Sequence, residues 1–281
     1  MKATINCLPC IVRQAVEAAA HATDDPASQR AALSAALGVL SREDLDSTPM
    51  ELGYAVHSTI ARVTGCADPY AQIKRESNRD ALAMYDQLTE AVAEAADPLL
   101  AAAKIAIAGN IMDFGALASF DTAATVATAL GSDFAIGDFD DLRQRLAGAQ
   151  HLLYLADNAG EVLFDRVFIE QMHDVEVTVA LKSEPFINDA TLADALAVGL
   201  DQVAELLTIR PGATSGNGFD QVWAEADIII AKGQGNYEVF SQAQGPIFFL
   251  LIAKCPVIAQ AIGVNQGDTI LQSQASRRMG A

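Results

Sequence analysis

Apolar residues recur at helical spacing along the first part of the chain. The clearest stretches, rich in Ala, Leu and Glu and without a convincing β-branched run, are residues 11–20, 31–40, 52–63 and 78–96. Apolar residues three and four positions apart lie on one face of a helix. The pattern therefore predicts an all-helical domain of several short helices over residues 1–98.

The pattern changes near residue 99, where short apolar runs begin to alternate with amphipathic stretches. The runs that we interpret as strands are residues 104–108, 151–156, 175–181, 226–231 and 256–262. Helix-spaced patterns lie between them at residues 114–130, 161–172, 190–198 and 245–253. Strands that alternate with helices are typical of βαβ units with right-handed crossovers and a mostly parallel sheet. We therefore predict an α/β domain over residues 99–281.

Acidic and amide residues stand where predicted strands end. The run at residues 151–156 stops at Asp157 and Asn158, and Asp189 precedes the helix that follows the next strand. Because the carboxyl ends of parallel strands line the ligand crevice, we expect these side chains to lie together. Carboxylate and amide oxygens suit Mg²⁺ or Mn²⁺, and a set without His or Cys disfavours zinc. The alternative interpretation is a set of ordinary turns and helix caps.

Lysines at strand ends are candidates to bind an oxyanion. Lys232 ends a predicted strand and enters a loop that starts at Gly233, and Lys182 ends another strand. The Gly-x-Gly at Gly233 and Gly235 is a poor dinucleotide fingerprint, because Glu238 stands where the third glycine would be. Solvated lysines at turns are the alternative.

Three further residues are candidates to bind the substrate or to activate water. Asn110 and Asp113 open the helix after the first predicted strand, and Glu161 opens the helix after Asp157. At the edge of the sheet, Asn110 would hold a substrate hydroxyl, while Asp113 or Glu161 would orient or deprotonate a water molecule. Helix capping and a favourable acid in the first turn of a helix explain them equally well.

Charge narrows the class of partner. The 281 residues include 36 acidic and 18 basic side chains, for a formal net charge of -18, and no stretch gathers Lys and Arg into a stripe. We therefore expect no nucleic-acid partner, and a phosphorylated ligand needs a metal ion or well-placed lysines to offset the field. The hydrophobic fraction of 51% is that of a compact protein with a substantial core.

Cysteine usage and apolar stretches favour a cytoplasmic protein. The cysteines are too few and too scattered for a disulfide framework, and the N-terminus lacks the pattern of an export signal. The apolar stretch at residues 246–264 is interrupted by Lys254 and Pro256, so we expect no membrane span. The four cysteines are Cys7, Cys10, Cys66 and Cys255.

Cys7 and Cys10 have the spacing of a redox or metal-binding pair. A thioredoxin-like site needs a strand before the pair, and too few residues precede Cys7 for one. A four-cysteine zinc site needs a second close pair, whereas Cys66 and Cys255 are isolated. We therefore expect a structural or vestigial role for the pair and keep a redox protein as an alternative.

Taken together, these residues resemble the metal-dependent damage-control phosphatase family, in particular its small prokaryotic branch with an N-terminal Cys-x-x-Cys. A departure from the family pattern is Ser183-Glu184, which stands where we expect a glycine and adds an acid near the anion site. The matching elements, in order, are Cys7-x-x-Cys10 with Arg13-Gln14, Asp68-Pro69-Tyr70 with Lys74 and Asn78, Gly109-Asn110-x-x-Asp113, Asp157-Asn158-Ala159-Gly160-Glu161 with Asp165, Asn188-Asp189-Ala190-Thr191, and Lys232-Gly233-Gln234-Gly235-Asn236-Tyr237-Glu238.

The resemblance implies a helical domain joined to a three-layer α/β/α domain. It implies a divalent metal ion held by Asp157, Asn158 and Asp189, with Mn²⁺ or Mg²⁺ expected and Ni²⁺ or Co²⁺ as other activators. It also implies hydrolysis of phosphate esters of small metabolites, either sugar phosphates or damaged phosphometabolites, with Lys232 as the phosphate contact. The residues then expected to bind the substrate are Asn110, Lys182, Lys232, Gly233, Asn236 and Glu238.

For this reaction we expect the metal to polarise the phosphoryl oxygens while Lys232 neutralises the charge that builds on them. Attack in line by a water molecule and attack by Asp157 itself both stay open. An alternative function is that of a non-catalytic, metal-dependent protein that binds a sugar phosphate or a nucleotide. A carboxylate methyltransferase is disfavoured, because the segment after the first predicted strand is poor in glycine. The sequence leaves the oligomeric state open.

Overall fold

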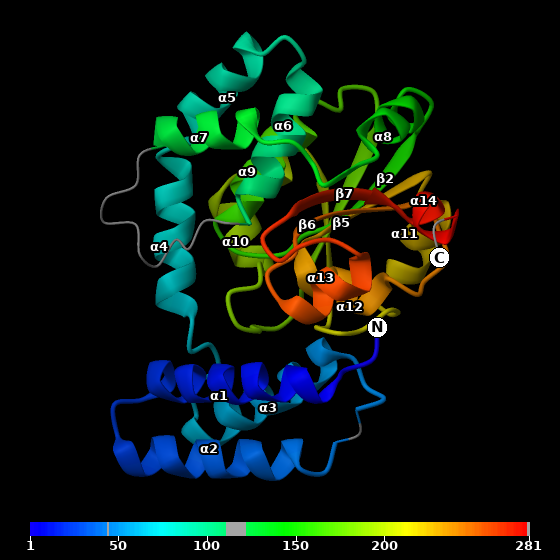
Figure 1. Ribbon diagram of the computed structural model, residues 1–281. Coiled ribbons are helices and arrows are strands. Elements are labelled where there is room, and N and C mark those ends of the chain that lie inside the picture. The colour runs from blue at the N-terminus through cyan, green and yellow to red at the C-terminus, as the bar shows by residue number, and fades with distance from the viewer. Residues whose placement is uncertain (44, 111–121, 280–281) are drawn as a thin grey trace.

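The computed structural model describes residues 1–43, 45–110 and 122–279. Within these ranges the chain forms a seven-stranded sheet with the order β1-β7-β6-β5-β2-β3-β4 (Figure 1). The neighbours from β6 to β4 are parallel, whereas β7 runs antiparallel to β6. The predicted α/β fold with a mostly parallel sheet is therefore confirmed. The strands are β1 (Ile136–Gly137), β2 (His151–Leu155), β3 (Glu176–Lys182), β4 (Glu205–Ile209), β5 (Ile228–Lys232), β6 (Ile247–Ile252) and β7 (Thr269–Ser273).

The first three α-helices form a separate bundle, which lies below the sheet in Figure 1. Local sequence signals start two of them: the Asp25 carboxylate accepts hydrogen bonds at the start of α2, and Thr48 forms a capping box with Glu51 at the start of α3. Alanines and aliphatic side chains of all three helices share one buried cluster. The helices are α1 (Leu8–Ala22), α2 (Pro26–Leu40) and α3 (Pro49–Thr64).

The next helices lead from this bundle to the sheet. In Figure 1, α4 runs upward from the bundle, and α5 to α7 lie at the top. The helices α4, α5 and α6 each contact α9, which covers the sheet. The N-terminal helical region thus divides between two cores, and the boundary after residue 98 stays a prediction. The bounds are α4 (Ala71–Leu82), α5 (Tyr85–Glu94), α6 (Pro98–Ala108) and α7 (Thr122–Gly131).

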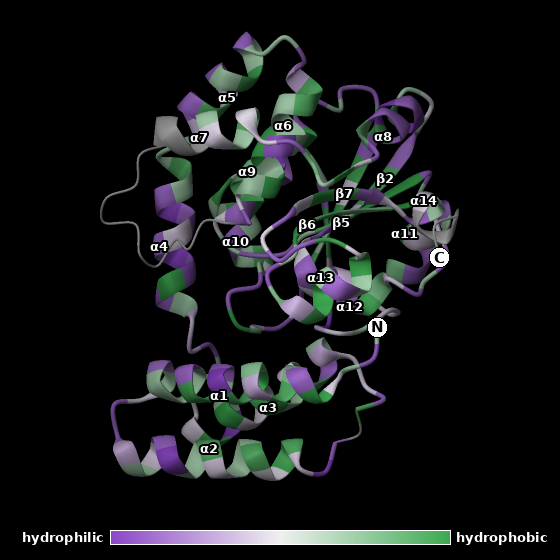
Figure 2. Ribbon diagram, in the orientation of Figure 1, coloured by the Kyte–Doolittle hydropathy of each residue, from purple (hydrophilic) through white to green (hydrophobic). Residues whose placement is uncertain are grey.

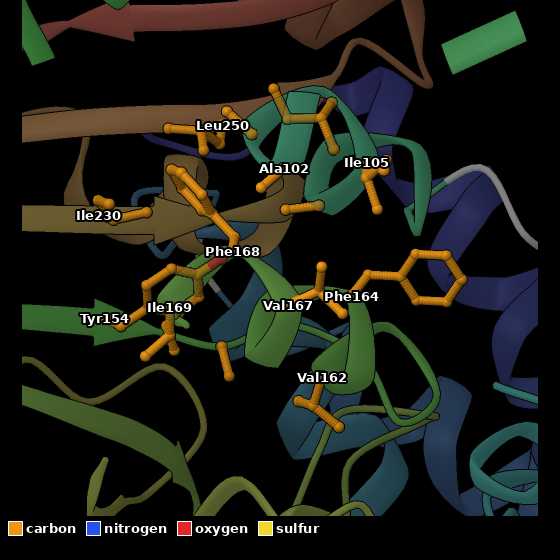
Figure 3. Packing of buried hydrophobic residues seen from close by; sticks show 14 of the residues in the cluster. Ala102, Ile105, Tyr154, Val162, Phe164, Val167, Phe168, Ile169, Ile230 and Leu250 are labelled. Carbon is orange, nitrogen blue, oxygen red and sulfur yellow. The ribbon is translucent and has the colours of Figure 1, made fainter. Parts of the chain in front are cut away.

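Helices cover both faces of the sheet. Tyr154, Ile230 and Leu250 pack on α6 and α9 on one face (Figure 3). Their neighbours along the strands face α11, α12 and α13 on the other, so both faces are apolar, and the central strands β5 and β6 are mainly green in Figure 2. In the described parts of the chain, every helix is too short or too polar to cross a lipid bilayer. The remaining helices are α8 (Phe139–Leu146), α9 (Glu161–Ile169), α10 (Leu192–Ala197), α11 (Phe219–Glu225), α12 (Gly233–Phe240), α13 (Pro256–Ile262) and α14 (Gln274–Met279), with 3₁₀ turns at η1 (Ile5–Cys7) and η3 (Leu200–Gln202).

Three predicted elements are of the wrong type. Residues 104–108 are not a strand but the end of α6, which starts where Asp97 caps the helix at Pro98. Residues 245–253 are not a helix, because they contain the fully buried strand β6. Residues 256–262 are not a strand but α13, which begins at a proline and is followed by Gly263 with φ +87° as its C-cap. Segments that are apolar all round lack a distinguishing period, so proline and glycine signals should have decided between helix and strand.

Other boundaries also differ from the prediction. The helix predicted at residues 78–96 is interrupted between α4 and α5, and β1, β4 and β7 were not predicted. The strands predicted at residues 151–156, 175–181 and 226–231 are confirmed as β2, β3 and β5. The beginning of the helix predicted at residues 114–130 lies outside the described residues, and α7 overlaps its later part.

The order of the strands places a crevice at one edge of the sheet. Strand β2 lies between β5 and β3: the chain passes from β2 to β3 on one side and returns from β4 to β5 on the other. Such a reversal of strand order creates a crevice at the carboxyl ends of the two strands on either side of it. A ligand site is therefore expected at the segments that follow β2 and β5.

Candidate functional site

Backbone hydrogen bonds join the loop after β2 to the loop after β3. The amide of Ala159 donates to the carbonyl oxygen of Asn188 at 2.8 Å, and the amide of Ala190 donates to that of Asp157 at 2.8 Å. Asn158 and Asp189 are thereby paired in an antiparallel bridge. The structure thus brings together Asp157, Asn158 and Asp189, the three residues expected to hold a metal ion.

The residue that follows β5, Gly233, packs directly against the Asp157 carboxylate. Gly233 has φ +74°, and a Cβ atom built on it would lie 1.9 Å from Oδ2 of Asp157. A position with this backbone angle favours glycine, and here the space is also filled by the carboxylate. Gly233 is therefore the residue that lets β5 approach Asp157, which explains its place in the loop.

Two amide side chains surround the Asp157 carboxylate. Nδ2 of Asn158 donates to Oδ2 of Asp157 at 2.9 Å and to Oε2 of Glu161 at 3.1 Å. Nδ2 of Asn110 donates to the same two oxygens at 2.9 and 2.8 Å. Because carboxylates only accept hydrogen bonds, they face the amide nitrogens and leave the amide oxygens free to face elsewhere. Glu161 and Asp157 thus orient both amides.

Lys232 lies beneath this layer and is fully buried. Its Nζ donates to Oε1 of Glu161 at 2.7 Å, to Oδ1 of Asp165 at 2.5 Å and to the carbonyl oxygen of Ala106 at 2.9 Å. Burial by itself lowers the pKa of Lys232, but the Asp165 and Glu161 carboxylates raise it above its ordinary value. The lysine is therefore the counter-ion of two buried acids.

Asp165 completes the buried ionic group. Its Oδ1 also accepts a hydrogen bond from the hydroxyl of Tyr154 at 2.6 Å. Burial raises the pKa of Asp165 to about 7, against the effect of the Lys232 ammonium. This arrangement joins β2, α9 and β5 below the loop that carries Asp157.

The carboxylates of Asp157 and Asp189 are short of positive charge. Burial and the neighbouring Glu161 raise the pKa of Asp157 to about 6, while nearby lysines lower it. Burial raises the pKa of Asp189 to about 8, although Lys182, whose Nζ is 3.8 Å from Oδ2 of Asp189, acts in the opposite direction. The raised pKa values show that ionising these two carboxyl groups is costly in the folded protein. A bound cation would stabilise their ionised forms.

Unpartnered oxygen atoms fit a divalent cation at this position. Oδ2 of Asp189 and Oδ1 of Asn110 are buried and make no hydrogen bond to any described residue. Residues 1–43, 45–110 and 122–279 contain no group of three His, Cys, Asp or Glu side chains that could hold a metal. A cation here would thus depend on two carboxylates and on amide oxygens, which are ligands for Mg²⁺ or Mn²⁺ rather than zinc.

A cavity of about 560 Å³ opens above these residues, between the helical bundle and the edge of the sheet. Asp157, Asn158 and Asp189 line it on the sheet side, whereas Cys10 of α1 and Met50 of α3 belong to the opposite wall. The bundle therefore contributes to the wall that faces a bound ligand.

The candidate substrate-binding residues lie in different layers around this cavity. Glu238 lines it, and burial raises the pKa of its carboxyl to about 7. Asn236 lies deeper: its Nδ2 donates to the carbonyl oxygens of Leu155, Ala156 and Lys232, and its Oδ1 accepts from Lys182. The residues outside the cavity lining are Asn110, Glu161, Lys182, Lys232, Gly233 and Asn236. Asp113 lies outside the described residues.

Lys254 was missed as a candidate. It follows β6, is exposed, lines the cavity and lies close enough to Asp157 to lower the pKa of its carboxyl. The available signal was the one used for Lys232, a lysine at the end of an apolar strand. The interpretation of residues 245–253 as a helix hides this signal, because Lys254 then follows a helix and not a strand.

Cys7 and Cys10 also line the cavity, together with Cys255. The Cys7 thiol accepts a weak hydrogen bond from the backbone amide of Thr4 at 3.5 Å. The Cys10 thiol accepts one from the Arg13 guanidinium at 3.7 Å. All four cysteines are free. The pair thus belongs to the wall of the site, and its role stays a prediction.

Comparison with known proteins identifies the family. A model of the damage-control phosphatase ARMT1-like domain matches residues 3–270. The chain belongs to this family. A damage-control phosphatase of Pyrococcus horikoshii is 31% identical over 282 residues, covering 96% of this chain and 97% of its own. A damage-control phosphatase of Archaeoglobus fulgidus is also 31% identical, over 287 residues that cover 96% and 98%.

The fold of the family is also known from a solved structure. The crystal structure of a DUF89 family protein from Pyrococcus horikoshii superposes with a TM-score of 0.91 at 30% identity, covering 98% of this chain and 99% of the other. The predicted membership of the damage-control phosphatase family is confirmed. The assignment to a branch with Cys-x-x-Cys stays a prediction.

Proposed function

We propose that this protein is a metal-dependent phosphatase that hydrolyses phosphate esters of small metabolites. The observation that carries the proposal is the convergence of Asp157, Asn158 and Asp189 at one side of a cavity, with Oδ2 of Asp189 lacking a hydrogen-bond partner among the described residues. The names of the two relatives as damage-control phosphatases support the reaction.

Asp157, Asn158 and Asp189 would hold the metal ion, for which Mn²⁺ or Mg²⁺ is the first expectation and Ni²⁺ or Co²⁺ the second. When bound, such an ion supplies Lewis-acid polarisation of the phosphoryl oxygens. Glu161 keeps the Asn158 amide turned so that its nitrogen faces the acids and its oxygen is available as a ligand. Lys232 neutralises Glu161 from below.

We assign the phosphate contact to Lys254 in preference to Lys232. Lys254 lines the cavity, whereas Nζ of Lys232 is already engaged by three buried acceptors. A lysine at the cavity edge attracts the phosphoryl oxygens and offsets the charge that builds on them in the transition state. Attack by water and attack by Asp157 both remain compatible with this geometry.

The cavity size and charge favour a small phosphorylated metabolite, such as a sugar phosphate. A volume of about 560 Å³ matches a small-molecule site. The wall contributed by the helical bundle includes neutral side chains such as Gln14 of α1 and Met50 of α3. The uncharged alcohol part of a phosphate ester therefore fits against this wall, because it leaves no charged protein side chain there without a partner.

The proposal is tested with metal-stripped protein, para-nitrophenyl phosphate and a panel of sugar phosphates, adding Mg²⁺, Mn²⁺, Co²⁺ or Ni²⁺ singly. We expect metal-dependent phosphate release that is lost in Asp157→Asn and Asp189→Asn. Asp227→Asn is the matched control, because Asp227 caps backbone amides of Gln150 and His151 at the opposite edge of the sheet and should leave activity unchanged. Metal binding without release of phosphate from any substrate would favour the binding-protein alternative.

The two lysines are separated by a second pair of variants. Lys254→Ala should raise KM roughly 10- to 100-fold, as expected for the loss of a charge-assisted hydrogen bond worth about 1.5–3 kcal/mol. Lys232→Met instead leaves two buried acids without their cation and should cost about 3–5 kcal/mol of unfolding free energy. An unchanged KM in Lys254→Ala would remove Lys254 from the phosphate site.

A further inference from the structure

Helix α4 contacts the loops of the candidate site through one buried side chain, Asn78. Its Oδ1 accepts a hydrogen bond from the amide of Gly160 at 2.7 Å, and its Nδ2 donates to Oδ1 of Asp194 at 2.9 Å. Asn78 is only 4% exposed. One amide group thus contacts both the segment after β2 and the segment after β3.

The Gly160 contact acts on the loop that carries Asp157 and Asn158. Gly160 has φ +76° and ψ -49°, a backbone conformation that is open to glycine and costly for other residues. Its amide is buried at the start of α9, so it needs an acceptor inside the protein. Asn78 supplies this acceptor and holds the turn in which the Asn158 amide meets Glu161.

The Asp194 contact acts on the loop that carries Asp189. Oδ2 of Asp194 accepts hydrogen bonds from the backbone amide of Thr191 at 2.9 Å and from its hydroxyl at 2.6 Å. Nζ of Lys74, one turn before Asn78 on α4, lies 3.5 Å from the same oxygen and 2.7 Å from Oδ2 of Asp68. The loop end next to Asp189 is therefore anchored to α4 by a hydrogen bond and an ion pair.

We propose that Asn78 is a positioning residue that sets the spacing between Asp157 and Asn158 on one loop and Asp189 on the other. The inference rests on the proposed metal-dependent function. It also gives a physical role to Lys74 and Asn78, for which the sequence alone suggested none, because these two residues of α4 hold the two loops together without lining the cavity. Partners outside the first ligand shell commonly change metal affinity about 10- to 100-fold.

The test compares Asn78→Ala and Asn78→Asp with Ser77→Ala. Ser77 is a matched control because it is the preceding residue on α4, is 5% exposed, and donates its hydroxyl hydrogen bond to Ile73 within the helix. Mn²⁺ affinity is measured on metal-stripped protein from the electron paramagnetic resonance signal of free Mn²⁺. Urea unfolding and the Mn²⁺ dependence of kcat are measured on the same samples.

We expect Asn78→Ala to weaken Mn²⁺ binding about 10- to 100-fold, with part of kcat recovered at saturating Mn²⁺. Asn78→Asp keeps the size and the acceptor for Gly160 but places a second carboxylate against Asp194, so it should weaken binding as well. Ser77→Ala should retain the wild-type affinity. If the alanine variant does not fold, Asn78→Asp decides the question.

Two failures are distinguishable. Wild-type protein that neither binds Mn²⁺ nor releases phosphate would overturn the proposed function. Wild-type protein that does both, with Asn78 variants that bind Mn²⁺ as tightly as Ser77→Ala, would overturn the positioning role alone. A loss of unfolding free energy without a change in Mn²⁺ affinity would likewise reduce Asn78 to a structural residue.

Discussion

Replacing Gly233 by alanine should separate the geometry of the site from the stability of the fold. An added Cβ would lie 1.9 Å from Oδ2 and 2.2 Å from Cγ of Asp157. Real Cβ atoms essentially never approach a heavy atom closer than 3.0 Å, so the carboxylate or the backbone has to move by about 1 Å. This displacement acts on one of the proposed metal ligands.

The expected size of the effect follows from two separate penalties. The φ of +74° should cost an alanine about 1–2 kcal/mol of unfolding free energy. A displacement of about 1 Å at a reacting group can cost about 100-fold in rate, so we expect kcat/KM to fall by at least that factor. Weaker Mn²⁺ binding should accompany the loss.

Gly65→Ala is the matched control. Gly65 has φ +73° at the end of α3, and apart from its neighbours along the chain no described residue comes within 4 Å of its added Cβ. Urea unfolding should show the cost of the positive φ in both variants, with overpacking against Asp157 adding about 1–3 kcal/mol in Gly233→Ala, while phosphatase kinetics should be impaired only in Gly233→Ala. Kinetics of Gly233→Ala within a few-fold of those of Gly65→Ala would refute the argument that Gly233 makes room for Asp157.

Two further predictions concern residues away from the proposed ligands. Burial lowers the pKa of His57 from 6.5 to about 4, so the unfolded chain takes up this proton first as the pH falls and the folded state loses stability from pH 6.5 downward. Urea unfolding at pH 7 and pH 5 should show that the wild type loses about 2 kcal/mol more than His57→Phe; equal losses would contradict this. The Cys7→Ser/Cys10→Ser double variant should keep its metal-dependent phosphatase activity, because the proposed ligands are oxygen atoms; loss of activity would favour a redox role.

The acidic site could be predicted because its signals are local. Residues 151–156 form an apolar run that stops at Asp157, and this pattern alone predicts a strand end. The rule that parallel strands end at a common edge then associates Asp157 with Asp189, and the structure pairs Asp189 with Asn158, the residue next to Asp157, in an antiparallel bridge. No knowledge of the packed core is needed for that step.

The type of several buried segments could not be predicted with the same security. The end of α6 and the strand β6 are both apolar on all sides, so neither has a period that distinguishes helix from strand. Their type depends on the neighbours with which they pack: α9 for the helix, and β5 and β7 for the strand.

By itself, the sequence determined the mostly parallel α/β fold, the family and the convergence of acidic residues at one edge of the sheet, because these follow from periodicity and from the order of motifs. Only the tertiary structure decided what each charge does. Lys232 and Lys254 both follow apolar runs, yet Glu161 and Asp165 enclose one while the other faces the cavity. Helix α9 covers Lys232 and supplies both of its acidic partners. The chemistry of a side chain depends on the neighbours that exclude water from it, and for Lys232 these neighbours lie far away along the chain.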